Sequence, residues 1–275
     1  MPELPETETI ARDLDRSIRG ATITGVSVAR PDVLRETSAA KLRSAVVGTT
    51  ITACWRRAKL VVLDLSSGDH IVVQPRFTGA LIVDDGSLDA GTLEYTTVHF
   101  ALADGRALRY RDVRRLGTVS LMSPSRFAAY SGALGIEPLD PAFTEAHLSA
   151  LLRASTQAVK KVVMDQRRVV GIGNIYANEA LWRSRVDPSR SSRSLSRDEV
   201  NALHTGIVDV LSEAIDARGT TFRDYRDSRG EPGGFASSLK AYGRGGEPCP
   251  RCQSKLVLTH AIDGRATVLC VRCQC

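Results

Sequence analysis

Four cysteines near the C-terminus have the spacing of a metal site. Cys249 and Cys252 form one C-x2-C pair, and Cys270 and Cys273 form a second pair 17 residues later. Each pair can supply two thiolates to one tetrahedral ion, which is the ligand arrangement of structural zinc sites. We expect one zinc ion with a structural role, because so small a unit has little room for catalytic groups.

The segment between the cysteine pairs predicts a β-hairpin. It contains Asp263-Gly264, a residue pair favoured in two-residue hairpin turns, which would put Arg265 near the tip. The metal would anchor the opposite end. The sequence therefore predicts a zinc hairpin that presents an arginine to a partner, with Cys54 and Cys275 outside the cluster.

Two prolines and two carboxylates open the chain as Pro2-Glu3 and Pro5-Glu6. Proline and acidic residues are favoured in the first turn of a helix, so a helix start is the simplest interpretation. Apolar residues follow at helical spacing at positions 10, 14 and 18, and Gly20 closes the segment. Taken alone, this stretch indicates a structural element and no chemistry.

A candidate anion site lies at Gly171-Ile172-Gly173-Asn174. Two glycines let a backbone approach an anion, and a helix that begins at Asn174 would leave N–H groups for a phosphate. A plain glycine turn with an asparagine cap is the alternative, and the basic surroundings give the two interpretations equal weight. Arg56-Arg57-Ala58-Lys59 is another basic stretch, for which a solvated charge run is the simplest interpretation.

The composition is that of a basic globular protein. The chain has 275 residues, 43% hydrophobic, with a net charge of +6 and a pI near 9.1. Its positive charge is concentrated between positions 155 and 195 and from position 240 to the end. A polyanion partner and surface charge that only maintains solubility explain this equally well. Aromatic residues make up only 5%, which argues against a base-stacking platform for single strands. The sequence shows no apolar run of membrane length and no signal segment. The protein is therefore expected in the cytoplasm, with no membrane partner.

Two patterns of periodicity divide the chain. Residues 22 to about 122 alternate in the manner of antiparallel strands, which predicts a sandwich or barrel. From about position 124 the period is helical. Ser196 and Glu199 predict a capping box for a helix with an apolar stripe from Val200 to Ile215, ended by Gly219. The six glycines of residues 227–246 predict a loop or linker.

Seven segments, in order, resemble those of the formamidopyrimidine-DNA glycosylases. They are MPELPE at the start, RRAK at 56–59, LRYRDVRRLG at 108–117, VVGIGNIYANEALW at 169–182, GTTFRDY at 219–225, YGRGGEPC at 242–249 and the zinc hairpin. The resemblance covers the whole chain. It implies an α+β fold with a catalytic β-sandwich domain and flanking helix (1–123), a helix-two-turn-helix domain (124–226), a lesion loop or linker (227–239) and a zinc finger (240–275).

The resemblance also gives the opening residues a chemical role. Loss of Met1 would expose the secondary amine of Pro2, and an α-amine has a pKa near 8, so more of it is a free nucleophile than of a lysine. By the same resemblance, Glu3 protonates the sugar ring oxygen or the leaving group, and Glu6 supports the proton transfers. Lys59 contacts phosphate and serves in β-elimination, and Arg265 serves in δ-elimination and phosphate binding.

Further residues are implied as DNA contacts. Family members fill the gap left by a flipped base with methionine, arginine and phenylalanine, where this chain has Phe77, Arg114 and Leu116. Asn174 matches a phosphate contact, and Lys160 is a weaker candidate. The chain departs from the family at two other positions, because Tyr95 replaces a common histidine and Thr156 a common lysine.

These features predict a bifunctional DNA glycosylase and abasic-site lyase of base excision repair. Its substrates would be 8-oxoguanine and formamidopyrimidines in double-stranded DNA, and the expected protein is a monomer associated with the bacterial nucleoid. One alternative is an endonuclease VIII-like enzyme for oxidised pyrimidines, favoured by the altered gap-filling residues. The other is a non-catalytic zinc-finger DNA-binding protein, against which Pro2, Glu3, Glu6 and Lys59 all count.

Overall fold

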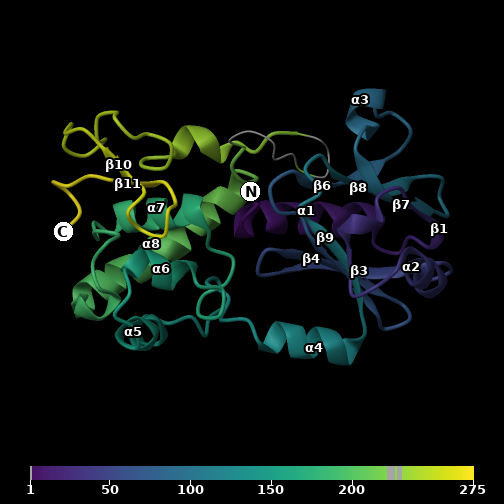
Figure 1. Cartoon of the computed structure of the whole chain (residues 1–275), viewed down its shortest axis with the longest axis horizontal. Helices are drawn as coiled ribbons and strands as arrows, with labels where there is room; N and C mark the ends of the chain where they lie inside the picture. Colours follow the sequence, from purple (N-terminus) through teal and green to yellow (C-terminus); the bar gives the residue numbers. More distant parts are fainter. Residues whose placement is uncertain (1, 222–226, 228–230) are drawn as a thin grey trace. The chain divides into compact units, whose positions relative to one another are not determined.

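The computed structural model describes residues 2–221, 227 and 231–275, which form two compact units (Figure 1). The first unit comprises Met1–Gly132 and Ala217–Gly234, and the second comprises Ala133–Asp216 and Phe235–Cys275. Most of the GTTFRDY stretch and part of the expected lesion loop lie outside the described residues. The α+β class is confirmed, and the expected domain boundaries stay predictions.

The first unit is a β-sandwich with a helix against it. One sheet has the order β1-β7-β8-β6 and the other the order β2-β9-β5-β4-β3. The pairs are antiparallel except for the parallel pair β2 and β9. The elements are α1 (Leu4–Ile18), β1 (Ile23–Val28), β2 (Leu34–Arg35), α2 (Ala39–Val46), β3 (Ile51–Arg57), β4 (Leu60–Leu65), β5 (His70–Gln74), β6 (Gly79–Asp84), α3 (Ala90–Leu93), β7 (Thr96–Leu102), β8 (Ala107–Asp112), β9 (Thr118–Met122) and α4 (Pro124–Gly132).

The helix α1 forms where the opening pattern predicts it. Ile10, Leu14 and Ile18 are fully buried in a core shared with both sheets, because their spacing puts them on one face. The carboxylate of Glu6 accepts the backbone N–H of Glu3 at 2.8 Å, which satisfies a donor that the first turn leaves without a helical partner. The predicted helix start is therefore confirmed.

The second unit is helical, with a small hairpin. It contains α5 (Glu145–Arg153), α6 (Val159–Met164), α7 (Asn174–Arg183), α8 (Arg197–Asp216), β10 (Val257–Thr259) and β11 (Thr267–Leu269), with short 3₁₀ turns between them. The capping box is confirmed, since Ser196 N–H donates to Glu199 at 2.7 Å and Glu199 N–H to the Ser196 hydroxyl at 3.3 Å. No helix within the described ranges is both long and apolar enough to span a membrane.

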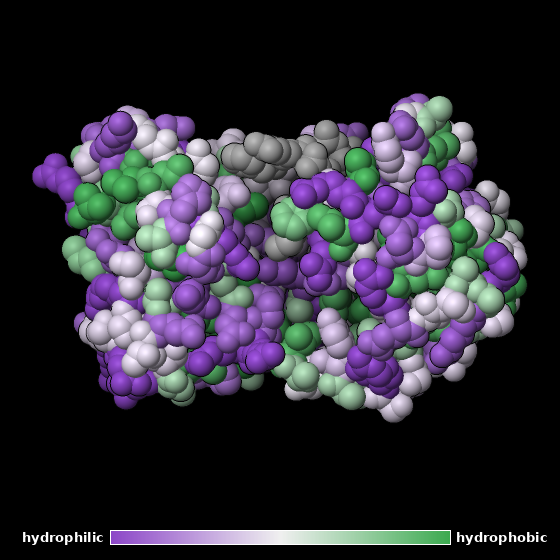
Figure 2. Space-filling model, in the orientation of Figure 1, coloured by the Kyte–Doolittle hydropathy of each residue, from purple (hydrophilic) through white to green (hydrophobic). Residues whose placement is uncertain are grey.

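The finger hairpin differs from the predicted two-residue turn. The strands end at Thr259 and begin again at Thr267, so a longer loop joins them. Asp263 and Gly264 still adopt the positive φ angles of a tight turn, 55° and 72°, but inside this loop. The local turn chemistry was predicted correctly, and the length of strand pairing was not. Figure 2 shows hydrophobic residues gathered over the finger, whose outer strand exposes Val257 and Leu258.

Two glycines in the sandwich lie against the buried hydroxyl of Tyr110. A Cβ at Gly117 would be 1.9 Å from the Tyr110 hydroxyl oxygen and 2.6 Å from the carbonyl oxygen of Gln74. A Cβ at Gly79 would be 2.2 Å from the carbonyl oxygen of Pro75. The starts of β6 and β9 can therefore lie this close to the end of β5 and to Tyr110 only because side chains are absent at the two glycines.

We predict that Gly117→Ala lowers the free energy of unfolding by about 1–3 kcal/mol, since the added methyl overpacks a backbone contact. Gly132→Ala is the matched control, because a Cβ there meets nothing within 4 Å. Urea unfolding of both variants measures the difference. Equal midpoints for the two would contradict the tight packing described here.

Candidate active site

The first residues of the chain are held by one buried carboxylate. Pro2 and Glu3 are buried, and Glu3 is extended ahead of α1. Glu6 is only 1% exposed, and its two oxygens accept the backbone N–H groups of Glu3 at 2.8 Å and of Thr220 at 2.7 Å. Glu6 thus ties the start of the chain to a segment more than 200 positions away in the sequence, within the same compact unit.

Gly219 lets that distant segment reach Glu6. Its φ is +82°, and a Cβ there would lie 2.9 Å from a carboxylate oxygen of Glu6 and 3.0 Å from its Cγ. A larger residue would be strained in this left-handed conformation and would also press on the glutamate. The sequence analysis treated Gly219 as a helix stop, and its contact with Glu6 was missed.

Lys59 lies in a tight turn whose supporting strand is fixed to α1. The turn joins β3 to β4 between Arg57 and Leu60, and Lys59 is half-buried. Just before it, Arg56 donates to Glu8 of α1 at 2.7 Å. Burial alone would raise the pKa of Glu8, but the guanidinium groups of Arg56 and Arg12 lower it below its usual range. An ionised Glu8 therefore fixes the turn that carries the lysine to the second turn of α1.

The first unit thus combines groups suited to covalent catalysis. A terminal proline would supply a secondary amine as nucleophile, two buried carboxylates could transfer protons, and a lysine is held on the neighbouring turn. The structure gives Pro2, Glu3, Glu6 and Lys59 a common support in α1, and their individual roles stay predictions.

The three expected gap-filling residues come from two neighbouring loops. Phe77 and Leu116 are 43% and 41% exposed, which is unusual for large apolar side chains. Arg114 lies with its guanidinium carbon 5.1 Å from the centre of the Phe77 ring. This cation–π contact joins the two loops into one projecting surface. Phe77 and Arg114 are therefore brought together, as the predicted wedge requires.

Asp112 holds these loops, and the sequence analysis missed it. This aspartate is 1% exposed and accepts hydrogen bonds from the Thr78 hydroxyl at 2.5 Å, from the Tyr110 hydroxyl at 3.2 Å and from Gly117 N–H at 2.8 Å. Arg114 N–H donates in turn to the Thr78 hydroxyl at 3.0 Å. The signal in the sequence was an acidic residue at the end of an alternating strand.

Tyr95 is connected to the same network through its backbone. Its carbonyl oxygen accepts the N–H of Asp112 at 3.1 Å, and its side chain is 48% exposed. The φ of Tyr95 is +66°, an uncommon conformation for a bulky residue. Arg111 lies with its guanidinium carbon 5.6 Å from the ring centre. An exposed aromatic ring next to an arginine suits contact with nucleic acid, which stays a prediction for Tyr95.

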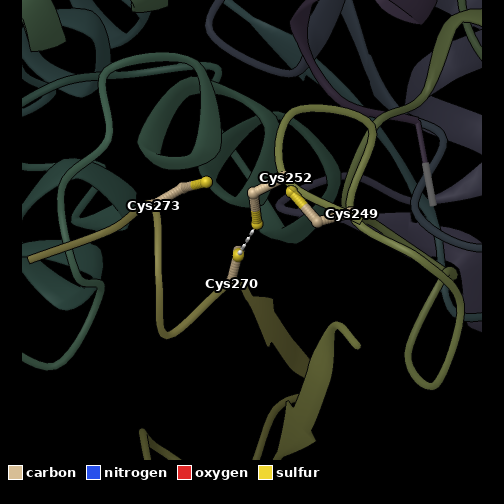
Figure 3. A group of neighbouring side chains, drawn as sticks. All are labelled: Cys249, Cys252, Cys270 and Cys273. Carbon is tan, nitrogen blue, oxygen red and sulfur yellow. Dashed lines mark hydrogen bonds between the residues drawn. The ribbon is translucent and has the colours of Figure 1, made fainter. Parts of the chain in front are cut away.

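The four cysteines of the second unit converge as predicted (Figure 3). The sulfur atoms of Cys249, Cys252, Cys270 and Cys273 all lie within 4.8 Å of one another, and those of Cys252 and Cys270 are 3.5 Å apart. A tetrahedron with Zn–S bonds of about 2.3 Å has sulfur–sulfur distances of about 3.8 Å, so the cluster has the size to hold one ion. Four cysteines in this arrangement can hold a metal ion, and all four are free of disulfides.

Asn174 and Lys160 meet at the finger loop, next to Arg265. The carbonyl oxygen of Ala266 accepts hydrogen bonds from Asn174 Nδ2 at 2.9 Å and from Lys160 Nζ at 3.1 Å. Lys160 also donates to the Thr267 hydroxyl at 2.8 Å and is fully buried, whereas Arg265 is 57% exposed. Among the three, Arg265 is thus the side chain most open to a phosphate, and the buried Lys160 supports the loop that carries it.

Two further residues of α7 hold the finger, and sequence reasoning missed both. Asn178 accepts Val268 N–H at 2.7 Å, and Glu179 accepts three successive backbone N–H groups, from Lys240 to Tyr242, at 2.7–2.9 Å. Burial raises the pKa of Glu179, although the three N–H groups act in the opposite direction. Both lie within the segment VVGIGNIYANEALW, in which the sequence predicted only the anion site at Gly171-Ile172-Gly173-Asn174.

Comparison with known proteins supports the predicted resemblance. The formamidopyrimidine-DNA glycosylase N-terminal domain matches residues 1–119, and the H2TH domain of the same proteins matches residues 134–226. The formamidopyrimidine-DNA glycosylases of Desulforamulus reducens and of Roseiflexus are 39% and 41% identical to the chain. The alignments cover all of this chain and 99% and 100% of those proteins.

Solved structures agree over the same length. The MutM (Fpg) protein of Thermus thermophilus superimposes with a TM-score of 0.87 at 34% identity, covering 99% of this chain and 98% of that one. Lactococcus lactis Fpg bound to DNA with an abasic site superimposes with a TM-score of 0.90 at 29% identity, covering 99% of each chain. Full-length matches in sequence and in structure mean that the chain belongs to the formamidopyrimidine-DNA glycosylase family.

Proposed function

We propose that this protein is a bifunctional DNA glycosylase and abasic-site lyase of base excision repair that removes oxidised purines. The observation that carries the proposal is the hydrogen bond from the backbone N–H of Glu3, the residue next to Pro2, to the buried carboxylate of Glu6. Relatives at about 40% identity over the full length carry the formamidopyrimidine-DNA glycosylase name. Lactococcus lactis Fpg has been solved with DNA containing a benzylated Fapy-dG and with abasic-site DNA. The oxidised-pyrimidine and non-catalytic alternatives are not favoured.

In the proposed reaction the chain terminus is the nucleophile. After loss of Met1, the lone pair of the Pro2 nitrogen attacks C1′ of the damaged nucleotide, and the bond from C1′ to the base breaks with the base leaving as its protonated form. The attached nitrogen then loses its proton, and the C1′–O4′ bond breaks as O4′ takes up a proton, which opens the sugar ring and leaves an iminium. Because proline nitrogen is secondary, this iminium is cationic without further protonation. It acidifies the C2′ hydrogen, and loss of that proton expels the 3′ phosphate by β-elimination. A second elimination expels the 5′ phosphate, and water releases the sugar fragment.

The carboxylates and the lysine support these steps. Glu3, next to the nucleophile, protonates the sugar ring oxygen or the leaving base. Glu6 supports the proton transfers and holds Glu3 by its backbone N–H. Lys59, on the turn fixed to α1, contacts phosphate and assists β-elimination.

DNA binding uses both compact units. Phe77, Arg114 and Leu116 fill the space left by the flipped nucleotide, where an apolar wedge offsets lost stacking. Tyr95 contacts the DNA next to this wedge. Asn174 and Arg265 bind phosphates, and Lys160 acts by holding the loop of Arg265. We also propose that the protein acts as a monomer at the nucleoid, where its DNA substrate would be found.

We propose that the cysteine cluster holds one structural zinc ion. Four thiolates suit zinc, and a site with four protein ligands leaves no open position for substrate. The Ser254 hydroxyl lies 2.8 Å from the sulfur of Cys252 and 3.3 Å from that of Cys270, so a neighbouring donor can stabilise the bound thiolates. When bound, the ion fixes one end of the hairpin that presents Arg265.

The nucleophile can be tested by blocking the terminus. A residue retained before Pro2 turns its amine into a tertiary amide with a delocalised lone pair, so an N-terminal tag should abolish excision and borohydride trapping on 8-oxoguanine DNA. Protease removal of the tag to a free Pro2 should restore both, with duplex binding equal before and after. Equal cleavage by the tagged protein would exclude Pro2. Faster cleavage of thymine glycol than of 8-oxoguanine opposite cytosine would instead favour the oxidised-pyrimidine alternative.

The finger can be tested with paired variants. Cys270→Ser should release zinc and weaken DNA binding, whereas Arg265→Ala should keep zinc and lose processing of damaged DNA. Cys275→Ser is the matched control, because Cys275 is exposed and outside the cluster. Metal content by atomic absorption and fluorescence of Trp182, which packs with Cys249 and Cys270, report the site. Full zinc content and full activity in Cys270→Ser would contradict the assignment.

The wedge can be tested by comparing two substrates. Phe77→Ala should slow excision from an intact duplex by about tenfold or more, since base unstacking costs a few kcal/mol. Cleavage at a preformed abasic site should fall less. Val47→Ala is the control, because Val47 is 41% exposed but lies outside the two loops. Equal losses on both substrates would argue that Phe77 only supports the fold.

A further inference from the structure

The segment that donates Thr220 N–H to Glu6 runs along one face of α1. Glu6 and Asp13 lie seven residues apart on that helix, and therefore two turns apart on the same side. Thr220 is bonded to Glu6, and Arg218 is bonded to Asp13. The segment is also bonded to Gly234, whose N–H donates to the Ala217 carbonyl at 2.9 Å. Two attachments to α1 thus fix residues 218–220.

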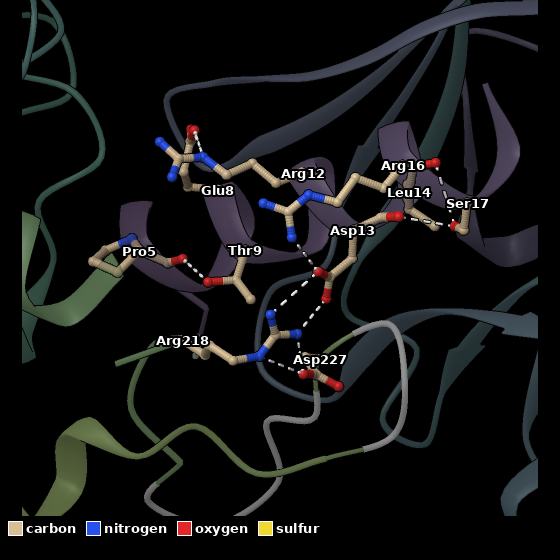
Figure 4. A network of polar contacts seen from close by, with 10 residues as sticks. All are labelled: Pro5, Glu8, Thr9, Arg12, Asp13, Leu14, Arg16, Ser17, Arg218 and Asp227. Carbon is tan, nitrogen blue, oxygen red and sulfur yellow. Dashed lines mark hydrogen bonds and ion pairs between the residues drawn. The ribbon is translucent and has the colours of Figure 1, made fainter. Parts of the chain in front are cut away.

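Arg218 makes the second attachment with two buried carboxylates (Figure 4). Its guanidinium donates to both oxygens of Asp13, at 3.2 Å from Nη1 and more closely from Nη2. It also donates from Nε to Asp227 at 3.1 Å and makes a second, closer contact there from Nη2. The side chains of Asp13 and Asp227 are 3% and 1% exposed. One arginine therefore joins α1 to both ends of the segment that lies between positions 218 and 227.

Burying Asp13 and Asp227 beside Arg218 costs free energy unless the ion pairs form. Buried carboxylates need a charged partner, and the φ of Arg218 is +62°, a conformation that glycine adopts more easily. Hydrogen bonding to Asp13, and to Asp227 after it, holds the pKa of Arg218 above its usual range. Arg218 thus occupies a backbone position suited to glycine, and its donors are matched by two acids.

We propose that Asp13, Arg218 and Asp227 form a clamp that keeps Thr220 N–H on Glu6 and thereby positions the terminal proline for attack. Arg218 is a positioning residue, because its contacts with Asp13 and Asp227 act on the reacting terminus through Thr220 and Glu6. The inference rests on the proposed function of Pro2 and Glu6. It adds a determinant of the reaction rate whose attachment point on α1, Asp13, lies two helical turns from Glu6.

Arg218→Gly tests the clamp with little risk to the backbone, because glycine accepts the left-handed φ. We expect single-turnover excision of 8-oxoguanine to slow about 10–100-fold, as for a misplaced catalytic group, with duplex affinity changed less than about twofold. Arg218→Lys keeps the charge without the fork of donors and should recover part of the rate. Arg109→Met is the matched control, since Arg109 makes a comparable pair with the buried Asp84 at 2.6 Å. An excision rate within twofold of wild type in Arg218→Gly, or an equal loss in Arg109→Met, would overturn the proposal.

A double-mutant cycle separates positioning from a general loss of stability. In a Glu6→Gln background the clamp has no carboxylate to hold, so adding Arg218→Gly should slow excision much less than it does in the wild type. The same fold-loss in both backgrounds would show that Arg218 does not act through Glu6, and would overturn the proposal.

A readout independent of activity completes the test. Amide hydrogen exchange at Thr220 should be faster in Arg218→Gly than in wild type and unchanged in Arg109→Met. Unchanged exchange at Thr220 in Arg218→Gly contradicts the clamp even if the enzyme is slower. Wild-type protein that neither cleaves nor is trapped would instead contradict the proposed function, while the exchange result would still decide whether the clamp exists.

Discussion

One buried carboxylate connects the parts of the site in the first compact unit. Glu6 accepts one N–H from the start of the chain and one from Thr220, and almost none of it is exposed to solvent. A carboxylate removed from water is stable only if its oxygens are satisfied, so both backbone segments are needed to keep it there. A chain terminus would ordinarily fray, but here its position is fixed by hydrogen bonds in the folded core.

Other contacts fix the elements that carry the predicted site residues. One face of α1 packs into the sandwich, and Glu6 and Asp13 on the same helix bind the segment that contains Gly219. The absence of a side chain at Gly219 permits the contact with Glu6. Arg56 fixes the lysine turn to the same helix through Glu8. In the second unit, side chains of α7 form hydrogen bonds with the backbone of the finger. Exposed groups such as Phe77 and Arg265 are thus carried on well-anchored loops.

Local features of this fold could be predicted from the sequence. The first helix, the Ser196–Glu199 capping box and the cysteine cluster depend on spacing within a few residues or on a known ligand pattern, and all three were found as expected. The hairpin turn was predicted with the right backbone angles but the wrong strand ends, because pairing depends on packing against α7. Glu179 and Arg218 were missed because they pair with groups 61 and 205 positions away in the sequence. Asp112 was missed although Tyr110 and Gly117 lie close to it in the sequence. Buried polar residues of this kind carry no periodic signal.

The central claim is that the nitrogen of Pro2 is the attacking group, held by Glu6. The most direct measurement is to reduce the reaction of untagged protein with 8-oxoguanine DNA by borohydride, digest the crosslinked protein, and locate the adduct by peptide mass spectrometry. The account predicts a sugar adduct on the N-terminal peptide, at the nitrogen of Pro2, in a chain that has lost Met1. An adduct on Lys59, with an unmodified N-terminal peptide, would contradict it.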